Sequence, residues 1–289
     1  MQIITLYERE EPKEQFLTPE LQRLYGGDLS FPKPDSNRPY VIGNFVETID
    51  GVVSFRIPGR SGGGEISGGS DEDRLVMGLL RSVSDAVLVG SRTFHEDPGH
   101  VRIPAFIYPE AKDLYAELRR KLGKPALPLN VILTASGKLD LNEPTFHTEG
   151  LPTAIMTTNE GASRIASDHG DISHITVRST GEAGCTTPGA ILKILADEFG
   201  IRLLLHEGGP TTFGQFLAAK MIDELFLTVA PQIAGRQSLA QRPSIAGETL
   251  FSPEMAPWFG LRSIKRAWDH LLLRYTSPQL SQLDTSPQL

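Results

Sequence analysis

Three junctions in the chain place small or hydroxyl-bearing residues where an apolar run of strand length ends in a turn. They are Thr48-Ile49-Asp50-Gly51, Gly90-Ser91-Arg92-Thr93 and Glu207-Gly208-Gly209-Pro210-Thr211-Thr212. Glycine lets a ligand approach the backbone closely, and hydroxyl and guanidinium groups donate hydrogen bonds to phosphate oxygens. Such junctions can hold an extended phosphorylated ligand, although each one alone also fits an ordinary capped turn.

The third junction has the strongest physical rationale. Its Gly208-Gly209 turn precedes an expected helix, whose first N–H groups and dipole favour an anion such as a pyrophosphate. A Rossmann Gly-x-Gly-x-x-Gly spacing is absent, and no Gly-Lys-Ser/Thr sequence follows Gly90 as in a Walker loop. A doubly wound dinucleotide fold is therefore the weaker nucleotide-binding interpretation.

The remaining histidines, serines and the cysteine do not form the motifs of a metal site or of a catalytic nucleophile. His95 and His100 flank Glu-Asp-Pro-Gly, a spacing that does not put both rings on one helical face, so no metal is expected. A Gly-x-Ser-x-Gly nucleophile is absent, and Cys185 is expected to be an incidental loop thiol. Because Cys185 is the only cysteine, the sequence also excludes an internal disulfide framework and favours a cytoplasmic setting.

The overall charge argues against a nucleic-acid partner. The formal net charge is −7, whereas nonspecific affinity for nucleic acid depends on many lysines and arginines that neutralise phosphates. Any anionic ligand must then meet a local arginine cluster. The acidic N-terminus does not resemble a signal peptide, and no run approaches the roughly 20 apolar residues that span a bilayer, so no membrane partner is expected.

The elements that must position these residues alternate between strands and helices, as in an α/β protein. The strands are expected at 40–46, 85–90, 130–134, 153–157, 172–177, 202–206 and 225–230, with a closing antiparallel pair at 261–267 and 270–275. Ser70 is expected to cap a helix with a buried stripe of Leu75, Leu79 and Val83, and a helix from Thr187 to Gly200 has a cap, a first-turn proline and a closing glycine. Leu114, Leu118 and Leu122 mark another helix.

These signals predict one α/β domain over residues 39–276. Residues 1–38 contain four prolines and a short amphipathic patch at Leu17, Leu21 and Leu24, and we expect them to form an arm without a catalytic role. Residues 277–289 are expected to be a disordered tail, because the polar TSPQL sequence recurs there with few apolar groups to pack.

Taken in order, the junctions resemble the reductase domain of the bifunctional riboflavin biosynthesis deaminase/reductase family, a relative of dihydrofolate reductase. The resemblance covers most of residues 40–235 and rests on the junctions together with Ile66-Ser67-Gly68, Leu80-Arg81, Ser84-Asp85, Asp97-Pro98, Arg102, Asp223-Glu224-Leu225 and Ala230-Pro231. It implies a dihydrofolate-reductase-like three-layer α/β fold with a mostly parallel central sheet, flanking helices and a C-terminal antiparallel pair.

The resemblance also implies a cofactor and a reaction. NADPH would lie across the carboxyl ends of the strands and transfer a hydride to the ribosyl carbon of 5-amino-6-(5-phosphoribosylamino)uracil, giving the ribitylamino product. The implied cofactor-binding residues are Val46, Thr48, Gly90, Ser91, Arg92, Thr93, Asp97, Gly208, Gly209, Pro210, Thr211, Thr212, Phe213, Gly214 and Gln215. The implied substrate-binding residues are Arg81, His100, Arg102 and Glu207, and Asp50 and Glu207 are the candidate catalytic residues.

The sequence departs from the family pattern in ways that leave the substrate open. Val52 stands where a basic residue commonly follows Asp-Gly, His100 stands where an apolar residue is usual, and the Asp97 loop is shortened. A dihydrofolate or pterin reductase and a non-catalytic nucleotide-binding module are the alternatives. The zinc deaminase motifs of the bifunctional family are absent from the chain. By resemblance, we expect a homodimer.

Overall fold

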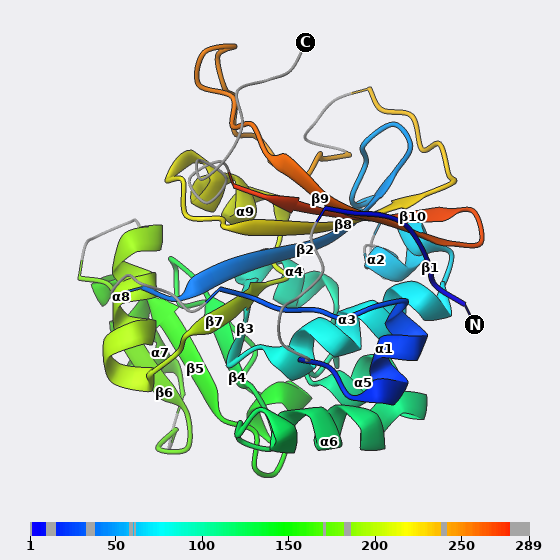
Figure 1. The fold of residues 1–289 in the computed structure, drawn as a ribbon. Coiled ribbons are helices and arrows are strands. Elements are labelled where there is room, and N and C mark those ends of the chain that lie inside the picture. Colours follow the sequence, from blue (N-terminus) through cyan, green and yellow to red (C-terminus); the bar gives the residue numbers. More distant parts are fainter. Residues whose placement is uncertain are drawn as a thin grey trace.

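The strands form one continuous sheet. The structure is a computed structural model that describes residues 2–9, 16–32, 38–57, 60, 62–169, 172–181, 186–237 and 242–277. Its 10-stranded sheet has the order β1-β9-β10-β8-β2-β7-β3-β4-β5-β6 (Figure 1). The strands are β1 (Ile4–Glu8), β2 (Tyr40–Thr48), β3 (Ala86–Gly90), β4 (Leu129–Leu133), β5 (Thr153–Thr157), β6 (Thr176–Ser179), β7 (Leu203–His206), β8 (Glu224–Ala230), β9 (Gly260–Ala267) and β10 (His270–Thr276).

The strand directions confirm the expected architecture. The pairs from β8 through β2, β7, β3, β4 and β5 to β6 are all parallel, whereas β10 pairs antiparallel with both β8 and β9. The expected strand at 172–177 is shifted, because residues 173 and 174 form a turn and pairing with β5 starts only at Thr176. The remaining strand predictions agree with the structure to within one or two residues at most ends.

Helices cover both faces of the sheet. They are α1 (Pro19–Tyr25), α2 (Gly63–Ser67), α3 (Asp71–Val83), α4 (Ser91–Glu96), α5 (Pro104–Ile107), α6 (Lys112–Lys121), α7 (Asn159–Asp168), α8 (Pro188–Phe199) and α9 (Pro210–Ala218). Alternate residues of a strand point to opposite faces, so Leu205 packs with α1, α3 and α6, whereas Leu204 packs with α8 and α9. The layered arrangement predicted from the sequence is therefore present.

Local signals set the helix boundaries as expected. The Ser70 hydroxyl accepts a hydrogen bond from the Asp73 N–H at 3.3 Å, and the Thr187 hydroxyl accepts one from the Ala190 N–H at 3.4 Å. Gly200 ends α8 with φ of 65°, in the left-handed region that glycine adopts at little cost. The predicted stripe of α3 is fully buried.

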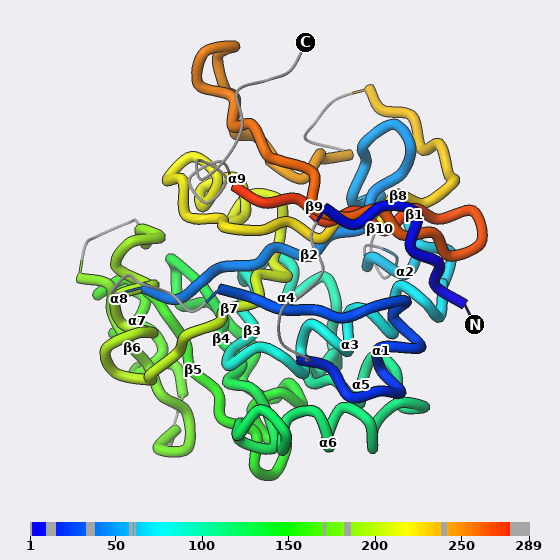
Figure 2. The backbone as a smooth tube through the Cα atoms, viewed as in Figure 1, coloured from blue at the N-terminus to red at the C-terminus, as the bar shows by residue number. Residues whose placement is uncertain are grey.

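The N-terminal segment is built into the domain rather than standing off as an arm. Strand β1 pairs antiparallel with β9 at the edge of the sheet (Figure 2). Leu17 and Leu21 are almost completely buried in the same core as α3. The buried Lys265 of β9 donates to the Thr5 hydroxyl at 2.7 Å and to the Gly26 carbonyl at 2.9 Å. Residues before the expected boundary at residue 38 therefore share a core with the domain that follows. Cys185 and residues 278–289 lie outside the described residues.

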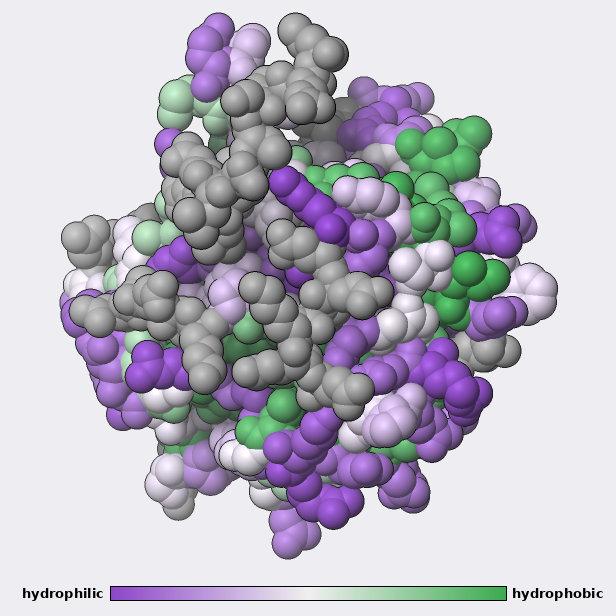
Figure 3. All heavy atoms as spheres, in the orientation of Figure 1, coloured by the Kyte–Doolittle hydropathy of each residue, from purple (hydrophilic) through white to green (hydrophobic). Residues whose placement is uncertain are grey.

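The surface is mixed in polarity, with apolar side chains grouped near the edge of the sheet. Figure 3 shows hydrophobic residues on the side of the molecule where β1 lies, and Leu6 of β1 and Trp268 between β9 and β10 are among the exposed ones. Across the residues that the structure describes, no helix combines the length and apolar character needed to cross a bilayer.

Candidate active site

A cavity of about 250 Å³ opens near the carboxyl ends of β2 and β7. Residues from α2, α3, α4 and the start of α9 complete its walls. The site residues expected from the sequence that line it are Val46, Arg81, Thr93, Asp97, His100, Arg102, Glu207, Gly209 and Pro210. Both the expected cofactor segment and the expected substrate residues thus reach one cavity, as ligand sites in α/β sheets commonly do.

Arg81 and Glu207 form a fully buried ion pair in this cavity. The Arg81 Nε and Nη2 atoms donate to the two Glu207 carboxylate oxygens, each at 2.8 Å, and Nη1 donates to the Ile103 carbonyl at 3.1 Å. This forked geometry is the strongest arrangement of a guanidinium and a carboxylate. The Arg81 side chain is only 1% exposed, so its charge is already balanced within the protein.

A second arginine holds the end of α3 in place. Arg119 on α6 is buried, and its Nη1 donates to the carbonyls of Arg81, Ser82 and Ser84 at 3.3, 3.1 and 2.8 Å. These carbonyls have no partner within the helix at its carboxyl end. Burial lowers the pKa of Arg119 to about 10, which still leaves it charged at neutral pH. Arg119 thereby fixes the helix turn that carries Arg81.

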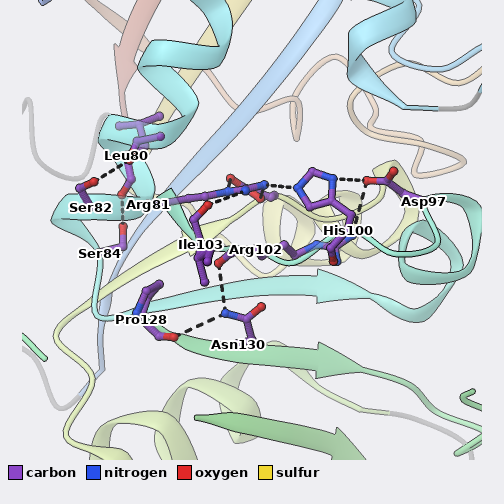
Figure 4. A network of polar contacts seen from close by, with 12 residues as sticks. Leu80, Arg81, Ser82, Ser84, Asp97, His100, Arg102, Ile103, Pro128 and Asn130 are labelled. Carbon is purple, nitrogen blue, oxygen red and sulfur yellow. Dashed lines mark hydrogen bonds and ion pairs between the residues drawn. The ribbon is translucent and has the colours of Figure 1, made fainter. Parts of the chain in front are cut away.

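His100 links Arg81 to Asp97 (Figure 4). Its Nε2 lies 2.9 Å from Arg81 Nη2, and its Nδ1 lies 2.6 Å from Asp97 Oδ2. Because a guanidinium only donates, Nε2 must accept, so the ring proton sits on Nδ1 and points to Asp97. Burial lowers the pKa of His100 and the neighbouring Arg81 adds to this, with Asp97 opposing them. Burial alone would raise the pKa of Asp97, but His100 and the arginines together lower it.

Arg102 is the other cation of the cavity. Its Nη1 donates to the His100 carbonyl at 3.1 Å, its guanidinium lies 5.9 Å from the centre of the Phe94 ring, and its Nη2 lies 4.0 Å from Asp97 Oδ2. Asn130 on β4 holds the backbone by donating to the Arg102 carbonyl at 3.1 Å. Burial and the adjacent Arg81 lower the pKa of Arg102 to about 10. Unlike Arg81, Arg102 has no forked carboxylate partner in the described part of the chain.

Glycines bring the β3–α4 and β7–α9 junctions into direct contact. A Cβ on Gly208 would lie 2.6 Å from the Gly90 nitrogen and 2.6 Å from Val89 Cα, and a Cβ on Gly209 would lie 2.8 Å from Thr93 Oγ1. Among the described residues, no side chain caps the start of α4 or of α9. The exposed Arg92 lies across this junction, with Nη1 3.4 Å from Thr211 Oγ1. The first N–H groups of both helices are therefore left for a ligand.

Not every residue of the expected cofactor segment presents its side chain to a ligand. Phe213 is completely buried, and its ring lies 4.6 Å from that of Phe45. Gly214 faces the Ala246 carbonyl, which a Cβ there would approach to 2.3 Å. These two positions of α9 serve packing. The residues expected at the site that do not line the cavity are Thr48, Asp50, Gly90, Ser91, Arg92, Gly208, Thr211, Thr212, Phe213, Gly214 and Gln215.

Asp50, a candidate catalytic residue, is held by hydrogen bonds from two segments of the chain. Its carboxylate accepts hydrogen bonds from the Thr48 hydroxyl at 2.6 Å and from the Ala234 and Gly235 N–H groups at 3.1 and 2.7 Å. The Thr48 hydroxyl bond is the main reason why the pKa of Asp50 falls to about 2. Asp50 is absent from the described residues that line the cavity, and its catalytic role stays a prediction.

Two buried groups at the site were missed from the sequence. Asp73 lines the cavity, although its position in an acidic first helix turn suggested only an interaction with the helix dipole. The fully buried His206 accepts the Gly208 N–H at Nδ1, 3.2 Å away, and burial lowers its pKa to about 3. Within the described part of the chain, His206 Nε2 has no hydrogen-bond partner. His206 directly precedes Glu207, so its place beside a candidate site residue could have been noticed in the sequence.

Several further cavity residues carried no sequence signal of their own. They are Asn44, Phe45, Val53, Ser54, Gly62, Gly63, Gly64, Met77, Glu96 and Ile107. Most of them are apolar or small and supply flat walls between the charged groups. These residues meet in one cavity because of the order in which the strands and helices pack. Sequence periodicity does not determine that packing order.

Comparisons with known proteins agree with this architecture. Residues 39–255 match the RibD C-terminal domain family. The chain is 26% identical over 198 residues to the riboflavin biosynthesis protein RibD of Aquifex aeolicus, covering 68% of this chain and 48% of that protein. It is 26% identical over 204 residues to the 2,5-diamino-6-ribosylamino-4(3H)-pyrimidinone 5′-phosphate reductase of Archaeoglobus fulgidus, covering 70% and 84%. The chain thus spans about half the length of the Aquifex protein.

Solved structures share the fold. A pyrimidine reductase-like protein from Corynebacterium diphtheriae superimposes with a TM-score of 0.63 at 22% identity, covering 89% of this chain and 98% of that one. RibD of Acinetobacter baumannii gives a TM-score of 0.62 at 20% identity, covering 84% and 59%. With the family match extending over most of the domain that carries the cavity, the chain belongs to the RibD C-terminal domain family.

Proposed function

We propose that this protein is an NADPH-dependent reductase that converts the phosphoribosylamino group of a pyrimidine to the ribitylamino product in riboflavin biosynthesis. The observation that carries the proposal is the family match over residues 39–255, because the cavity residues lie within that span. Two relatives are named for riboflavin biosynthesis and for reduction of a ribosylaminopyrimidinone phosphate, which supports a reductase. The sequence expectation named the uracil form of the substrate.

The α4–α9 junction fits the phosphates of a nicotinamide cofactor. Its glycines let the β3–α4 and β7–α9 junctions pack closely, both helix starts lack side-chain caps among the described residues, and Arg92 adds an exposed positive charge. We expect the N–H groups of Gly209, Thr211 and Thr212 and the side chains of Arg92 and Thr93 to hold the cofactor. When bound, the reduced nicotinamide supplies the hydride.

The other cavity residues have positioning roles in this proposal. Reduction breaks the bond between C1′ and the ring oxygen of the ribosyl group, adds the hydride to C1′ and adds a proton to that oxygen. The Arg81–Glu207 pair is rigid and neutral overall, which suits it to orient the ribosyl hydroxyl groups. Apolar side chains such as Phe45, Val53 and Met77 help to exclude water from the reacting carbon.

Arg102 is the favoured residue for the substrate phosphate. Both arginines were expected to serve this purpose, but Arg81 is already neutralised by Glu207, whereas Arg102 has only a longer contact with Asp97. Replacing Arg102 by Met should therefore raise the KM for the phosphorylated pyrimidine by roughly 10-fold to 100-fold, since a charge-assisted hydrogen bond contributes about 1.5–3 kcal/mol. The Kd for NADPH should change little.

The homodimer expected from the resemblance is retained as part of the proposal. Leu250, Met255 and Trp258 are 84%, 61% and 82% exposed, and they lie at or beside a second cavity of about 560 Å³. A cluster of exposed apolar side chains of this kind commonly marks a protein interface. Light scattering should give twice the chain mass of 31.6 kDa, and a single-chain mass would contradict the dimer.

The function is tested by the loss of reduced-nicotinamide absorbance. Purified protein and NADPH are incubated separately with the phosphoribosylamino-uracil, with its 2-amino counterpart and with dihydrofolate. Turnover of either pyrimidine supports the proposal, and Arg178→Met, which replaces an exposed arginine on β6, is the matched control for Arg102→Met. Turnover of dihydrofolate alone would assign the protein to pterin reduction, and no turnover at all would contradict a reductase of these substrates.

A further inference from the structure

Asp73 is a buried carboxyl group that faces the cavity without a cation beside it. It lies in the first turn of α3, is 6% exposed, and lines the cavity together with Asn44 and Met77. Ion pairs within the described chain join Asp71 to Arg74 on the same turn, but none of them reaches Asp73. Burial raises the pKa of Asp73, and the hydroxyls of Thr228 and Ser67 together with the charges of His270 and Arg74 offset this only in part.

Two other carboxyl groups of the cavity, Glu207 and Asp97, already have their partners. Glu207 is held by the two nitrogen atoms of Arg81, and Asp97 is held by His100. The Thr228 and Ser67 hydroxyls fill only part of the acceptor capacity of the Asp73 carboxylate, and no cation pairs with it among the described residues. A ligand that supplies further hydrogen-bond donors would complete this buried group.

We propose that Asp73 binds the substrate ring through a 2-amino-4-oxopyrimidine edge. The inference rests on the proposed function, because it places the ring of that substrate in the same cavity. A carboxylate accepts two parallel hydrogen bonds, and this edge offers two adjacent donors, the ring N3–H and the 2-amino group. A uracil edge has a carbonyl oxygen at position 2, which would face the carboxylate as a second acceptor. Asp73 therefore selects the 2-amino pyrimidine over the uracil.

The surroundings of Asp73 suit a flat ring. Val46 and Met77 provide apolar surface in the cavity that Asp73 lines, and Gly63 and Gly64 line it as well. A pterin carries the same 2-amino-4-oxo edge as the monocyclic pyrimidine, so Asp73 would recognise both ligands by the same hydrogen bonds. The phosphate at the other end of the pyrimidine distinguishes them, since only that substrate also depends on Arg102.

The test is a reversal of base preference by Asp73→Asn. An asparagine amide keeps the size of the side chain but presents one acceptor and one donor, which matches the N3–H and 2-oxo groups of uracil. Wild-type protein should reduce the 2-amino pyrimidine with a kcat/KM at least 10-fold above that for the uracil. A charge-assisted hydrogen bond between the 2-amino group and Asp73 accounts for a ratio of roughly 10-fold to 100-fold. In Asp73→Asn, this ratio should fall at least 10-fold and move toward the uracil.

Asp71→Asn is the matched control, because Asp71 is an exposed residue of the same helix turn, paired with Arg74. It should leave the preference unchanged. A wild-type preference for the uracil, or a ratio that Asp73→Asn does not alter, would overturn the assignment of Asp73 while leaving the reductase intact. Dihydrofolate serves as the pterin arm, and its reduction should be insensitive to Arg102→Met.

Binding separates failure of this inference from failure of the proposed function. If NADPH binds but neither pyrimidine is reduced, the reductase proposal fails, and calorimetry then measures the Kd of the 2-amino pyrimidine and of dihydrofolate directly. Weaker binding of at least one of them by Asp73→Asn, at least 10-fold and with unchanged NADPH affinity, would still support the role of Asp73. Equal affinity of wild type and variant for both would overturn it.

Discussion

Glu207 and Asp73 line the same cavity and are both buried, but the protein treats the two carboxyl groups in opposite ways. Glu207 follows β7 and receives two 2.8 Å hydrogen bonds from Arg81, whereas Asp73 begins α3 with no cation in contact among the described residues. A paired charge makes a rigid wall that needs nothing from a ligand. A buried carboxylate without a cation lowers stability and is useful only when a ligand completes it. We therefore assign the Arg81–Glu207 pair to positioning the substrate and Asp73 to selecting its base.

Breaking the pair should have the largest effect. Arg81→Met leaves Glu207 buried without its cation, and loss of one partner from a buried ion pair typically costs about 3–5 kcal/mol. We expect the free energy of unfolding from urea titration to fall by that amount. Arg23→Met, at an exposed pair with Glu20, should change it by under roughly 0.5 kcal/mol. An Arg81→Met protein as stable as the wild type would show that Glu207 does not need the pair.

Moving Glu207 should have the next largest effect. In Gly208→Ala, the new Cβ would lie 2.6 Å from backbone atoms of Val89 and Gly90, so the β7–α9 junction must open. Overpacking of this kind costs about 1–3 kcal/mol, and the Kd for NADPH should rise together with the loss of stability. Gly189→Ala in α8, where the nearest atom is 3.4 Å away at the end of Met221, is the control and should be neutral or slightly stabilising.

Acid should lower the stability of the folded protein through His206, which directly precedes Glu207. The pKa of His206 is about 3 in the folded protein and near 6.5 when unfolded, so between these values only the unfolded chain takes up the proton. Stability should therefore fall as the pH drops below about 6.5, by about 2 kcal/mol at pH 5, with His100 adding in the same direction. Thermal melts of His206→Asn should show a flatter pH dependence, while those of His174→Asn, at an exposed histidine, keep the wild-type slope.

Asp73→Asn should have the smallest effect on stability and the opposite sign. The pKa of Asp73 is raised in the folded protein, so its ionisation destabilises the fold once the pH exceeds the unfolded value near 3.9. The uncharged asparagine side chain removes that cost, and we expect a gain of roughly 1 kcal/mol at pH 7 that disappears toward pH 3. If the substitution instead destabilised the protein at pH 7, the hydroxyl bonds to Asp73 would outweigh the cost of its burial, and the comparison with Glu207 would fail.

Much of the fold could be predicted from the sequence because its signals are local. Ser70 and Gly200 mark helix ends by their own chemistry, and the apolar strands of the central sheet are buried on both faces. Strand β1 was missed because it lies at the edge of the sheet and most of its side chains are exposed. Its apolar residues therefore did not show the pattern of a buried strand.

The candidate site was only partly predictable, for a related reason. The resemblance supplied Arg81, Arg102 and Glu207, but the contacts that distinguish the two arginines join segments far apart in the chain. The Ala234 and Gly235 N–H groups that hold the Asp50 carboxylate are likewise far from it in the chain, so sequence patterns do not reveal these bonds. Acidic residues at a helix start are normally explained by the dipole, so only the location of Asp73 beside the cavity reveals its role.

The most direct test of the proposed function follows the hydride itself. Protein is incubated with NADPH that carries deuterium at the transferable position of the nicotinamide and with the 2-amino phosphoribosylaminopyrimidine, and the product is examined by mass spectrometry and NMR. The account predicts one deuterium per product molecule, located on C1′ of the new ribityl chain. Product without the label on that carbon, or consumption of NADPH with no ribityl product, would contradict it.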